Sequence, residues 1–401
     1  MNPRWEGLLE ELPEGLDGLA QLEWLRRHVP AEEARQLAEL AQARRRARGK
    51  LREPDKLWLS RKGLEQATNR RVAEYRAHRF AMIARDEWVT DGTAGIGGDA
   101  LELVRAGVRL RCVERDPHTA RLLRANLASI PECTTEVVEG ELQELAPQDM
   151  EWLFVDPDRR TGDRPGGPRA GPRRSLDPAR WSPAWDGLLP LLSSCKGACV
   201  KLPPALVPSS LGLPDELRRS FEWISVDGEL KELCLWTGAL AGPGGRRAVI
   251  LRGDQLEVHT GVVDREVPAL DPDAAVTIPY LADPDPALIA AGLLGAFAYP
   301  LAAAPLASDL GYLGLNKRPD RLPLAASFYA VLDSVPLDRK RVRAMLNEHG
   351  IGPLVVKKRG LSESSDELAA RMKGKGKAQG LVIAARLDPG RRVFLVRKLE
   401  K

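Results

Sequence analysis

The residues with the clearest chemical potential are a glycine-rich segment, Asp91–Asp99 (DGTAGIGGD), which follows a short apolar run. Glycines let the backbone turn tightly and approach a ligand closely, and a helix that begins after them offers unpaired N–H groups. The spacing Gly95-x-Gly97-x-x-Ala100 also fits a dinucleotide-binding fingerprint. The glycines therefore predict a nucleotide cofactor without saying which one.

Acids at the ends of four successive apolar runs narrow that choice. Asp91 precedes the glycines, where a negative charge suits the ammonium group of an aminoacyl sulfonium ligand and not a pyrophosphate. Glu114 ends the second run, where an acid can bind two ribose hydroxyls. Glu139-Gly-Glu141 ends the third, a position suited to an adenine amine, and Asp156 ends the fourth. Each acid alone has a common alternative role as a helix N-cap, but four in register favour one crevice.

The elements that must position these acids follow from the alternation of short apolar runs with helix-length stretches such as Pro117–Leu127. Strands are expected at Trp88–Thr90, Val108–Val113, Glu136–Val138, Trp152–Val155 and Ala198–Leu202. This alternation is typical of a doubly wound parallel α/β sheet, whose ligands bind outside the carboxyl ends of the strands. Glu222–Val226 and Leu230–Trp236 then flank Asp227-Gly228, which predicts a β-hairpin.

These segments, taken together, resemble a known enzyme class. DGTAGIGGD, the VERDP segment, VEGEL and FVDPDRR, in that order, resemble motifs I to IV of class I S-adenosylmethionine-dependent methyltransferases. Leu57–Phe80 is similar to the lead-in of a bacterial group related to trimethylguanosine synthases, which carries a THUMP-like C-terminal domain. That group's C-terminal signature resembles three stretches here: IPYLADPDPALIAAGLL, SFYAVLDSVPLDRKRVRAMLNEHGIGPLVVKKRG and MKGKGKAQGLVIAAR.

The resemblance covers nearly the whole chain from about Leu57 and implies a Rossmann-like, seven-stranded methyltransferase sheet with S-adenosyl-L-methionine as cofactor. It implies contacts to the methionine moiety from the glycine segment, to the ribose from Glu114, and to the adenine from Asp116 or Glu141. The implied cofactor-binding residues are Asp91, Thr93, Gly95, Gly97, Glu114, Asp116 and Glu141.

The resemblance places Asp156 at the reacting centre as the catalytic residue. We expect it to orient the methyl acceptor by hydrogen bonding and, as a weaker claim, to accept a proton. Enzymes that methylate exocyclic amines resemble one another in a D/N-P-P-aromatic sequence, whereas Asp156-Pro157 is followed here by Asp158-Arg159-Arg160. This departure puts an exocyclic amine in doubt and leaves the acceptor atom open.

Basic residues supply the candidate substrate contacts. Arginines crowd the Pro- and Gly-rich segment beyond the fourth strand, at positions 159, 160, 164, 169, 173 and 174, of which Arg159, Arg160 and Arg174 are the chosen candidates. Arginine binds phosphates bidentately, which suits a nucleic-acid substrate. A solvated basic loop is an equally weighted alternative.

The C-terminal end is also basic, because residues 327–401 hold 17 Lys+Arg against 8 Asp+Glu, a net charge of +9. Lys357, Lys358 and Arg359 end an expected strand, and Lys373 and Lys375 lie in a loop of alternating Lys and Gly. We expect this loop to expose backbone N–H groups beside ammonium groups as a phosphate cradle. Few aromatic residues accompany it, so a module that binds the RNA backbone is favoured over one that stacks on bases. A basic surface without a nucleic-acid role is the alternative.

Length and composition limit the number of domains that the chain can form. The 401 residues, 43% hydrophobic and 29% charged, predict two or three folded domains. We expect a helical region at 1–60, the methyltransferase domain at 61–240, a small mixed connecting domain at 246–325 with a ferredoxin-like fold as one option, and the basic THUMP-like domain at 326–401. The uncharged stretch Ala287–Ser308 is broken by glycines and prolines and is expected to be a core helix that runs into a loop.

Other classes of protein are disfavoured. Five cysteines without framework spacing, and a first segment without an apolar core, predict a cytoplasmic protein with neither a disulfide scaffold nor a signal peptide. The five histidines are scattered and no metal site is expected.

The function expected from all of this is methylation of a base of structured RNA, either transfer or ribosomal RNA. The alternatives are a methyltransferase for a protein or small molecule, a non-catalytic RNA-binding protein with a vestigial cofactor pocket, and a dinucleotide oxidoreductase, which Asp91 disfavours. The sequence leaves the oligomeric state open.

Overall fold

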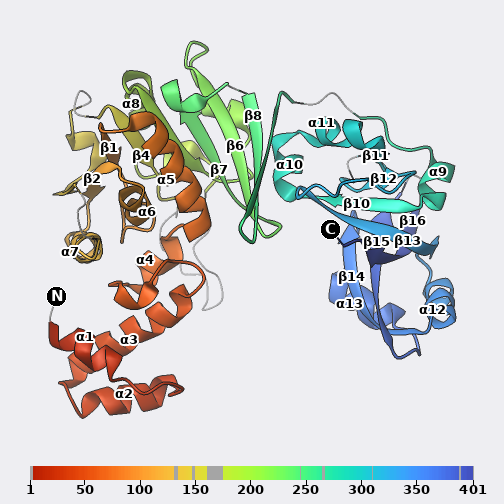
Figure 1. Ribbon diagram of the computed structural model, residues 1–401, viewed down its shortest axis with the longest axis horizontal. Helices are drawn as coiled ribbons and strands as arrows, with labels where there is room; N and C mark the ends of the chain where they lie inside the picture. Colours follow the sequence, from red (N-terminus) through yellow and green to blue (C-terminus); the bar gives the residue numbers. More distant parts are fainter. Residues whose placement is uncertain are drawn as a thin grey trace. The chain divides into compact units, whose positions relative to one another are not determined.

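The computed structural model describes residues 3–130, 134–146, 150–159, 175–243, 245–263, 267–308, 310–387 and 390–400. The chain forms two compact units (Figure 1). The first unit consists of Met1–Ser220 and Leu233–Gly244, and the second of Phe221–Glu232 and Gly245–Lys401. The first unit therefore contains both the expected helical region and nearly all of the expected methyltransferase domain.

The first unit begins with helices, as predicted. They are α1 (Pro3–Glu10), α2 (Gly18–Arg26), α3 (Ala31–Ala47), the short 3-10 helix η1 (Pro54–Lys56), α4 (Arg61–Gln66) and α5 (Arg70–Ala84). A small apolar cluster that includes Leu8, Leu25 and Leu37 holds the first three together. Asp17 caps α2, because its carboxylate accepts the N–H groups of Leu19 and Ala20.

The strands after these helices form one sheet in the order β3-β2-β1-β4-β5-β7-β6-β8-β9. Their bounds are β1 (Trp88–Asp91), β2 (Arg109–Glu114), β3 (Thr135–Glu139), β4 (Trp152–Val155), β5 (Gly197–Leu202), β6 (Arg219–Val226), β7 (Glu229–Thr237), β8 (Gly245–Arg252) and β9 (Gln255–Gly261). Strands β1 to β5 pair in parallel, and β7 pairs antiparallel with β5. The prediction of a parallel sheet that finishes with an antiparallel hairpin is confirmed.

Helices separate the parallel strands. They are α6 (Ala100–Arg105), α7 (Pro117–Leu127) and α8 (Trp185–Ser194), with short 3-10 turns η2 (Leu142–Glu144), η4 (Pro178–Arg180), η5 (Pro208–Leu211) and η6 (Gly238–Ala241). Helix α7 has the predicted bounds, because Asp116 caps it and Pro117 supplies a preset φ in its first turn. Every residue of β4 and β5 is buried, which explains why these strands read as continuous runs and not as alternating patterns.

The second unit contains a seven-stranded sheet in the order β11-β12-β10-β13-β16-β15-β14. Its strands are β10 (Tyr280–Pro284), β11 (Ala303–Pro305), β12 (Leu313–Leu315), β13 (Ala326–Pro336), β14 (Ile351–Arg359), β15 (Ala378–Arg386) and β16 (Arg391–Lys398). Its helices are α9 (Pro272–Thr277), α10 (Pro286–Ala291), α11 (Leu294–Ala298), η7 (Tyr299–Leu301), α12 (Arg339–Glu348) and α13 (Ser365–Met372). Strands β14 and β15 are parallel, whereas β10 pairs antiparallel with β12 and β13, β11 with β12, and β16 with β13 and β15.

Residues 246–325 were expected to form a separate connecting domain, but their strands are divided between the two sheets. Strands β8 and β9 extend the first sheet, whereas β10 to β12 join β13 in the second. Strand β13 pairs with β10 on one side and β16 on the other, so the expected boundary at 325/326 falls inside one continuous sheet. The physical reason is that β13 would otherwise present an unpaired apolar edge, which proteins avoid.

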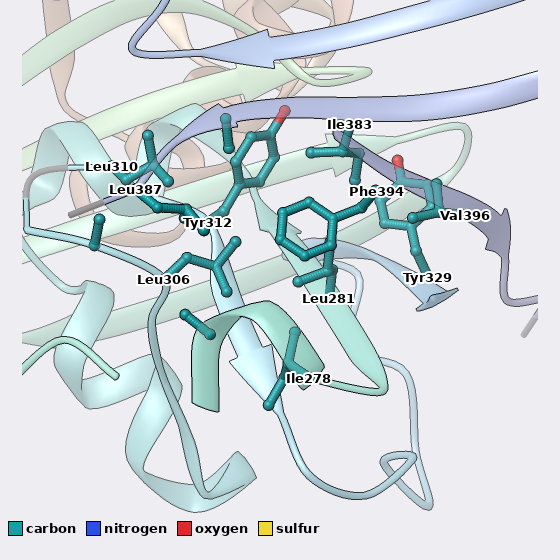
Figure 2. Close-up of a cluster of buried hydrophobic side chains, with 13 residues drawn as sticks. Ile278, Leu281, Leu306, Leu310, Tyr312, Tyr329, Ile383, Leu387, Phe394 and Val396 are labelled. Atoms are coloured by element: carbon teal, nitrogen blue, oxygen red, sulfur yellow. The ribbon is translucent and has the colours of Figure 1, made fainter. Parts of the chain in front are cut away.

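Both faces of the second sheet are covered. Val382 and Ala384 of β15 pack against α12 and α13, whereas Ile383 and Ala385 face a second cluster with Tyr312 and residues near α9. Figure 2 shows this second cluster, in which Phe394 lies among Leu281, Leu306, Tyr312 and Ile383. Successive side chains of β15 point to opposite faces of the sheet, so one continuous apolar run contributes to both clusters.

The uncharged stretch after Ala287 contains the rest of α10, then α11, η7 and β11. None of the helices within the described ranges is long and apolar enough to cross a membrane. Cys112, Cys195, Cys199 and Cys234 are buried free thiols, while Cys133 lies outside the described residues.

Candidate active site

The glycine segment forms a tight turn between β1 and α6. Gly95 and Gly97 have φ angles of +56° and +97°, a region that residues with a side chain seldom adopt. At Gly97 a Cβ would come within 2.9 Å of Leu123 Cδ1, whereas at Gly95 it would point into open space. Gly97 is therefore required for packing against α7, and Gly95 leaves room beside the turn for a ligand.

Glu114 ties the end of β2 to this turn. Its Oε2 accepts the N–H of Gly95 at 2.9 Å, and its Oε1 accepts the N–H of Asp116 at 2.9 Å. Each carboxylate oxygen keeps a second lone pair, so the same group can still accept hydrogen bonds from two hydroxyls of a ligand. The local hydrogen bonds fix its orientation in advance.

Asp91 ends β1 and is 1% exposed. Its Oδ1 accepts the N–H of Thr93 at 3.1 Å. Burial, followed by repulsion from Asp99 and Asp156, raises the pKa of the Asp91 carboxyl well above its ordinary value. A ligand that brings a positive charge would relieve this cost, which is the chemistry expected of an ammonium group.

Asp156 follows β4 and is held by an ion pair that the sequence did not reveal. Its backbone N–H donates to Thr93 Oγ1 at 2.7 Å, and its Oδ2 lies 2.7 Å from Lys201 Nζ. Lys201 belongs to β5, and its ammonium also donates to Thr68 Oγ1 at 2.9 Å. The side chains of Lys201 and Asp156 are 11% and 25% exposed, so the pair lies at the margin of the buried region.

Thr68 extends this arrangement to a second, more buried pair. Its hydroxyl donates to Asp99 Oδ2 at 2.5 Å, and the other oxygen of Asp99 is bound by Arg76 Nη1. The Arg76 guanidinium lies 4.6 Å from the centre of the Phe154 ring, and its side chain is 1% exposed. Asp156, Lys201, Thr68, Asp99 and Arg76 therefore form one continuous network.

The segment before the sheet is packed directly onto the glycine turn. A Cβ on Gly63 of α4 would collide with Ile96, and one on Gly98 would lie 3.1 Å from Ala67 Cβ. The buried amide of Asn126 accepts the N–H of Trp58 at 2.7 Å and donates to the carbonyls of Trp58 and Ile96. Helix α4 and the residues around it are therefore part of the site's wall and not a separate appendage.

The two adenine candidates have local partners. The Asp116 carboxylate accepts hydrogen bonds from the hydroxyl and N–H of Thr119, which lower its pKa, the hydroxyl most. Glu141 lies 3.6 Å from Arg115 on the surface. Asp116 thus acts as the N-cap of α7, which is the alternative role that an isolated acid commonly has.

Of the three candidate substrate-binding arginines, Arg159 is among the described residues. The backbone carbonyl of Arg159 accepts the N–H of Ser175 at 2.8 Å, and Asp158 beside it bridges to Ser182. Arg160 and Arg174 lie outside the described residues, as do the arginines at 164, 169 and 173.

The basic residues at the end of β14 form ion pairs and hydrogen bonds with other residues of the second unit. Lys357 Nζ and Arg359 Nη2 lie 2.7 and 2.8 Å from the two oxygens of Asp283. Lys357 also lies over the ring of Tyr329, and Arg359 over that of Tyr312. Burial lowers the pKa of Lys357, but Asp283 and then Tyr329 together outweigh burial, so the pKa is raised. Lys358 donates to the carbonyl of Leu361.

The loop that carries Lys373 and Lys375 differs from the expected cradle of backbone N–H groups. The N–H groups of Gly374, Gly376 and Ala378 donate to the carbonyls of Gly352, Ile351 and Gly350. The N–H of Lys375 donates to Asn347 Oδ1 at 2.8 Å. These groups are used to fasten the loop and are not available to a phosphate, while the side chains of Lys373, Lys375 and Lys377 are exposed.

Sequence reasoning missed Lys201, Thr68, Arg76 and Asn126. Lys201 had a visible signal, because it is the one charged residue in the otherwise apolar strand Gly197–Leu202. A charged residue at a buried strand position usually has a partner. Thr68 and Arg76 had no comparable signal, since their partner is distant in sequence.

The described residues hold no group of three or more His, Cys, Asp and Glu side chains that could bind a metal ion. The turn at Gly95, the fixed carboxylate of Glu114 and the buried acid Asp91 do suit a nucleoside that carries an amino-acid group. When bound, S-adenosyl-L-methionine supplies an activated methyl group.

Known proteins resemble the chain over most of its length. An uncharacterized S-adenosylmethionine-dependent methyltransferase of Mycobacterium tuberculosis is 30% identical over 372 residues, which cover 88% of this chain and 93% of the relative. A crystal structure from Porphyromonas gingivalis W83, of a protein assigned as a methyltransferase, aligns with 99% of this chain and 97% of its own, with a TM-score of 0.75 and 20% identity.

Two further similarities cover parts of the chain. The ribosomal RNA small subunit methyltransferase J of Alkalilimnicola ehrlichii is 34% identical over 114 residues, which cover 26% of this chain and 42% of the relative. Residues 326–398 match the THUMP domain-like family. The relation to trimethylguanosine synthases stays a prediction. The chain belongs to the S-adenosylmethionine-dependent methyltransferases, with a THUMP-like domain at its C-terminal end.

Proposed function

We propose that this methyltransferase modifies a base of structured RNA, either transfer or ribosomal RNA. The observation that carries the proposal is the combination, in one chain, of a methyltransferase crevice with a THUMP-like domain whose lysine side chains are exposed. The similarity of 114 residues to a ribosomal RNA methyltransferase supports it. We also propose a cytoplasmic location, which suits the buried free thiols.

The cofactor would lie along the ends of β1 and β2. In this proposal Asp91 binds the ammonium group, the turn with Thr93, Gly95 and Gly97 lies against the methionine part, and Glu114 binds the ribose. The adenine would lie near Asp116 or Glu141. Both residues stay candidates, because the Asp116 carboxylate caps α7 and Glu141 is the N-cap of η2 in a capping box.

Asp156 would face the acceptor. Its Oδ2 is bound to Lys201, so Oδ1 is the atom that we assign to hydrogen bonding with the acceptor and, where the acceptor loses a proton, to receiving it. Lys201 would fix the direction of the carboxylate, and Thr93 fixes the backbone from which it projects. Alignment of this kind is the main contribution a protein makes to a displacement at an activated carbon.

The RNA contacts divide between two sets of residues. Arg159 stands three residues beyond Asp156, at the place where a substrate phosphate would pass, and Arg160 and Arg174 remain candidates on sequence grounds. Lys373 and Lys375 offer exposed ammonium groups. Lys357 and Arg359 are weaker candidates than the sequence suggested, because both are already held in ion pairs with the carboxylate of Asp283.

The test is methyl transfer from tritium-labelled S-adenosylmethionine by the purified full-length protein. RNA from a strain that lacks the gene should become labelled, and RNA from the parent strain should not, because its sites are already methylated. Label that enters only protein or small molecules in a lysate of the same deletion strain would favour the alternative acceptors. Asp156→Asn serves as the matched control for label that is not enzymatic.

A further inference from the structure

We propose that Lys373, Lys375 and Lys377 form a fixed row of ammonium groups that binds successive phosphates of one RNA strand. The inference rests on the proposed RNA substrate and adds the surface and the mode of contact. These three residues are defined here as the lysine row. They alternate with Gly374 and Gly376 between the end of α13 and the start of β15.

The glycines explain how the row is held. A Cβ built on Gly374 would collide with the carbonyl of Ile351, and one on Gly376 with the carbonyl of Gly350. On the opposing segment, a Cβ on Gly352 would collide with the carbonyl of Gly376. Neither glycine has a positive φ, so the absence of a side chain here serves close approach of two backbones and not an unusual backbone conformation.

The backbone hydrogen bonds of the loop also hold it against the rest of the domain. The N–H groups of Gly374, Gly376 and Ala378 all donate to the segment 350–352, and Asn347 of α12 binds the N–H of Lys375. One side of the loop is therefore closed against the protein. The three lysine side chains are exposed, and their ammonium groups make no hydrogen bond or ion pair to the described residues.

The geometry fits a nucleic-acid strand. Residues two apart are separated by at most about 7 Å, since a fully extended strand rises 3.2–3.4 Å per residue, and the bends at 375–377 make this an upper limit for the row. That is comparable with the spacing of consecutive phosphates on one strand, so three phosphates can be met by three ammonium groups. No aromatic residue lies within the loop, which favours contact with the backbone and not with the bases.

The row differs from four other basic groups of this domain, which have acidic partners. Lys357 and Arg359 share the single carboxylate of Asp283, and Arg371 and Arg391 share that of Glu363. Keeping three like charges together without a counter-ion is unfavourable in the free protein. The loop is nevertheless fastened at four backbone N–H groups, so binding a polyanion costs little ordering of the backbone.

The test measures binding of the full-length protein to bulk transfer RNA and to a small-subunit ribosomal RNA transcript at several salt concentrations. The triple variant Lys373→Gln, Lys375→Gln, Lys377→Gln should lose at least about tenfold in affinity, and its salt slope should fall by about 2 to 3, because each phosphate contact contributes about 0.7 to 0.9. The matched control, Lys317→Gln, Arg318→Gln, Arg321→Gln, removes three exposed charges from the loop between β12 and β13 and should change the slope by less than about 1.

Gly376→Ala is a second variant that keeps every charge. It should weaken RNA binding by displacing the row, while unfolding of the protein remains cooperative. The proposal is overturned if the two triple variants lose affinity equally, or if the lysine-row variant binds RNA as the wild type does. Wild-type protein that binds anionic lipid vesicles but neither RNA would overturn it together with the RNA substrate. Loss confined to the lysine row would support both.

Discussion

The network at the ends of β4 and β5, which joins Asp156 to Arg76, and the lysine row of the second unit both contain several charged groups, but their charges have opposite surroundings. In the network, Asp99 and Arg76 are buried and paired, and Asp156 is paired with Lys201. In the lysine row, Lys373, Lys375 and Lys377 are exposed, and backbone contacts hold the loop without using the ammonium groups. The first arrangement fixes side chains for chemistry, and the second keeps charge available for a partner.

The largest loss of stability is expected at the buried ion pair between Arg76 and Asp99. Arg76→Met should lower the free energy of unfolding by about 3–5 kcal/mol, because it leaves the Asp99 carboxylate buried without its cation. Urea denaturation followed by circular dichroism measures this. Arg61→Met, which removes an exposed partner of Glu65, is the control and should cost less than about 1 kcal/mol. Equal effects of the two changes would mean that burial does not distinguish these pairs.

The next largest effect is expected at Lys201. Lys201→Met should reduce the rate of methyl transfer by about 100-fold, the lower range for a group that supports acid–base or orienting chemistry, while affinity for S-adenosylhomocysteine changes by less than about threefold. Lys201→Arg should restore part of the rate. The control is Lys196→Met, just before the same strand, whose ammonium pairs with Glu87 and Glu151 on the surface. A parallel loss of rate and cofactor affinity would show that Lys201 has a merely structural role.

Asp91 gives a prediction about pH. Its raised pKa means that the free folded protein favours the neutral carboxyl, so this group's contribution to stability is lost as pH rises from the ordinary value for Asp through the raised one. A ligand ammonium favours the ionised form instead. Affinity for S-adenosylhomocysteine should therefore rise with pH across the same window, and binding should release protons.

Calorimetry in buffers with different ionisation enthalpies measures this proton release. In Asp91→Asn the pH dependence should disappear, and affinity above the window should be weaker than in the wild type. An unchanged pH profile in the variant would remove Asp91 from the cofactor site.

The smallest effect is expected at the lysine row. The triple glutamine variant should change the free energy of unfolding by less than about 0.5 kcal/mol, because exposed side chains without partners contribute little to stability. Thermal unfolding at low salt measures the change. A small increase in stability is the expected sign, since the substitution removes repulsion between like charges. A loss of more than 1 kcal/mol would mean that these lysines serve the fold.

The order of elements was predictable from the sequence, and residue spacing explains why. The strands before Asp91, Glu114 and Asp156 are short apolar runs between helix-length stretches, and the hairpin at Asp227-Gly228 has a strong local signal. Because parallel strands in such a sheet end at one edge, their order alone predicts that the acids at their ends lie close together. Helix α7 was fixed by its local cap and its proline.

The parts that could not be predicted depend on contacts between residues far apart in the chain. Lys201 is 45 residues from Asp156 and 133 from Thr68, so no local pattern indicates either bond. The ion pair of Lys357 with Asp283 is hidden for the same reason. The Lys-Gly alternation was noticed in the sequence, but its glycines serve contact with the segment 350–352 and not a cradle of N–H groups.

The proposed methylation of RNA is tested most directly by the modified nucleosides in RNA from living cells. A strain without the gene should lack one methylated nucleoside in transfer or ribosomal RNA, measured by mass spectrometry. The wild-type gene should restore that nucleoside, and a gene encoding Asp156→Asn, expressed at an equal level, should not. If every nucleoside is unchanged in the deletion strain, or if Asp156→Asn restores the missing one fully, the proposed reaction at this crevice is contradicted.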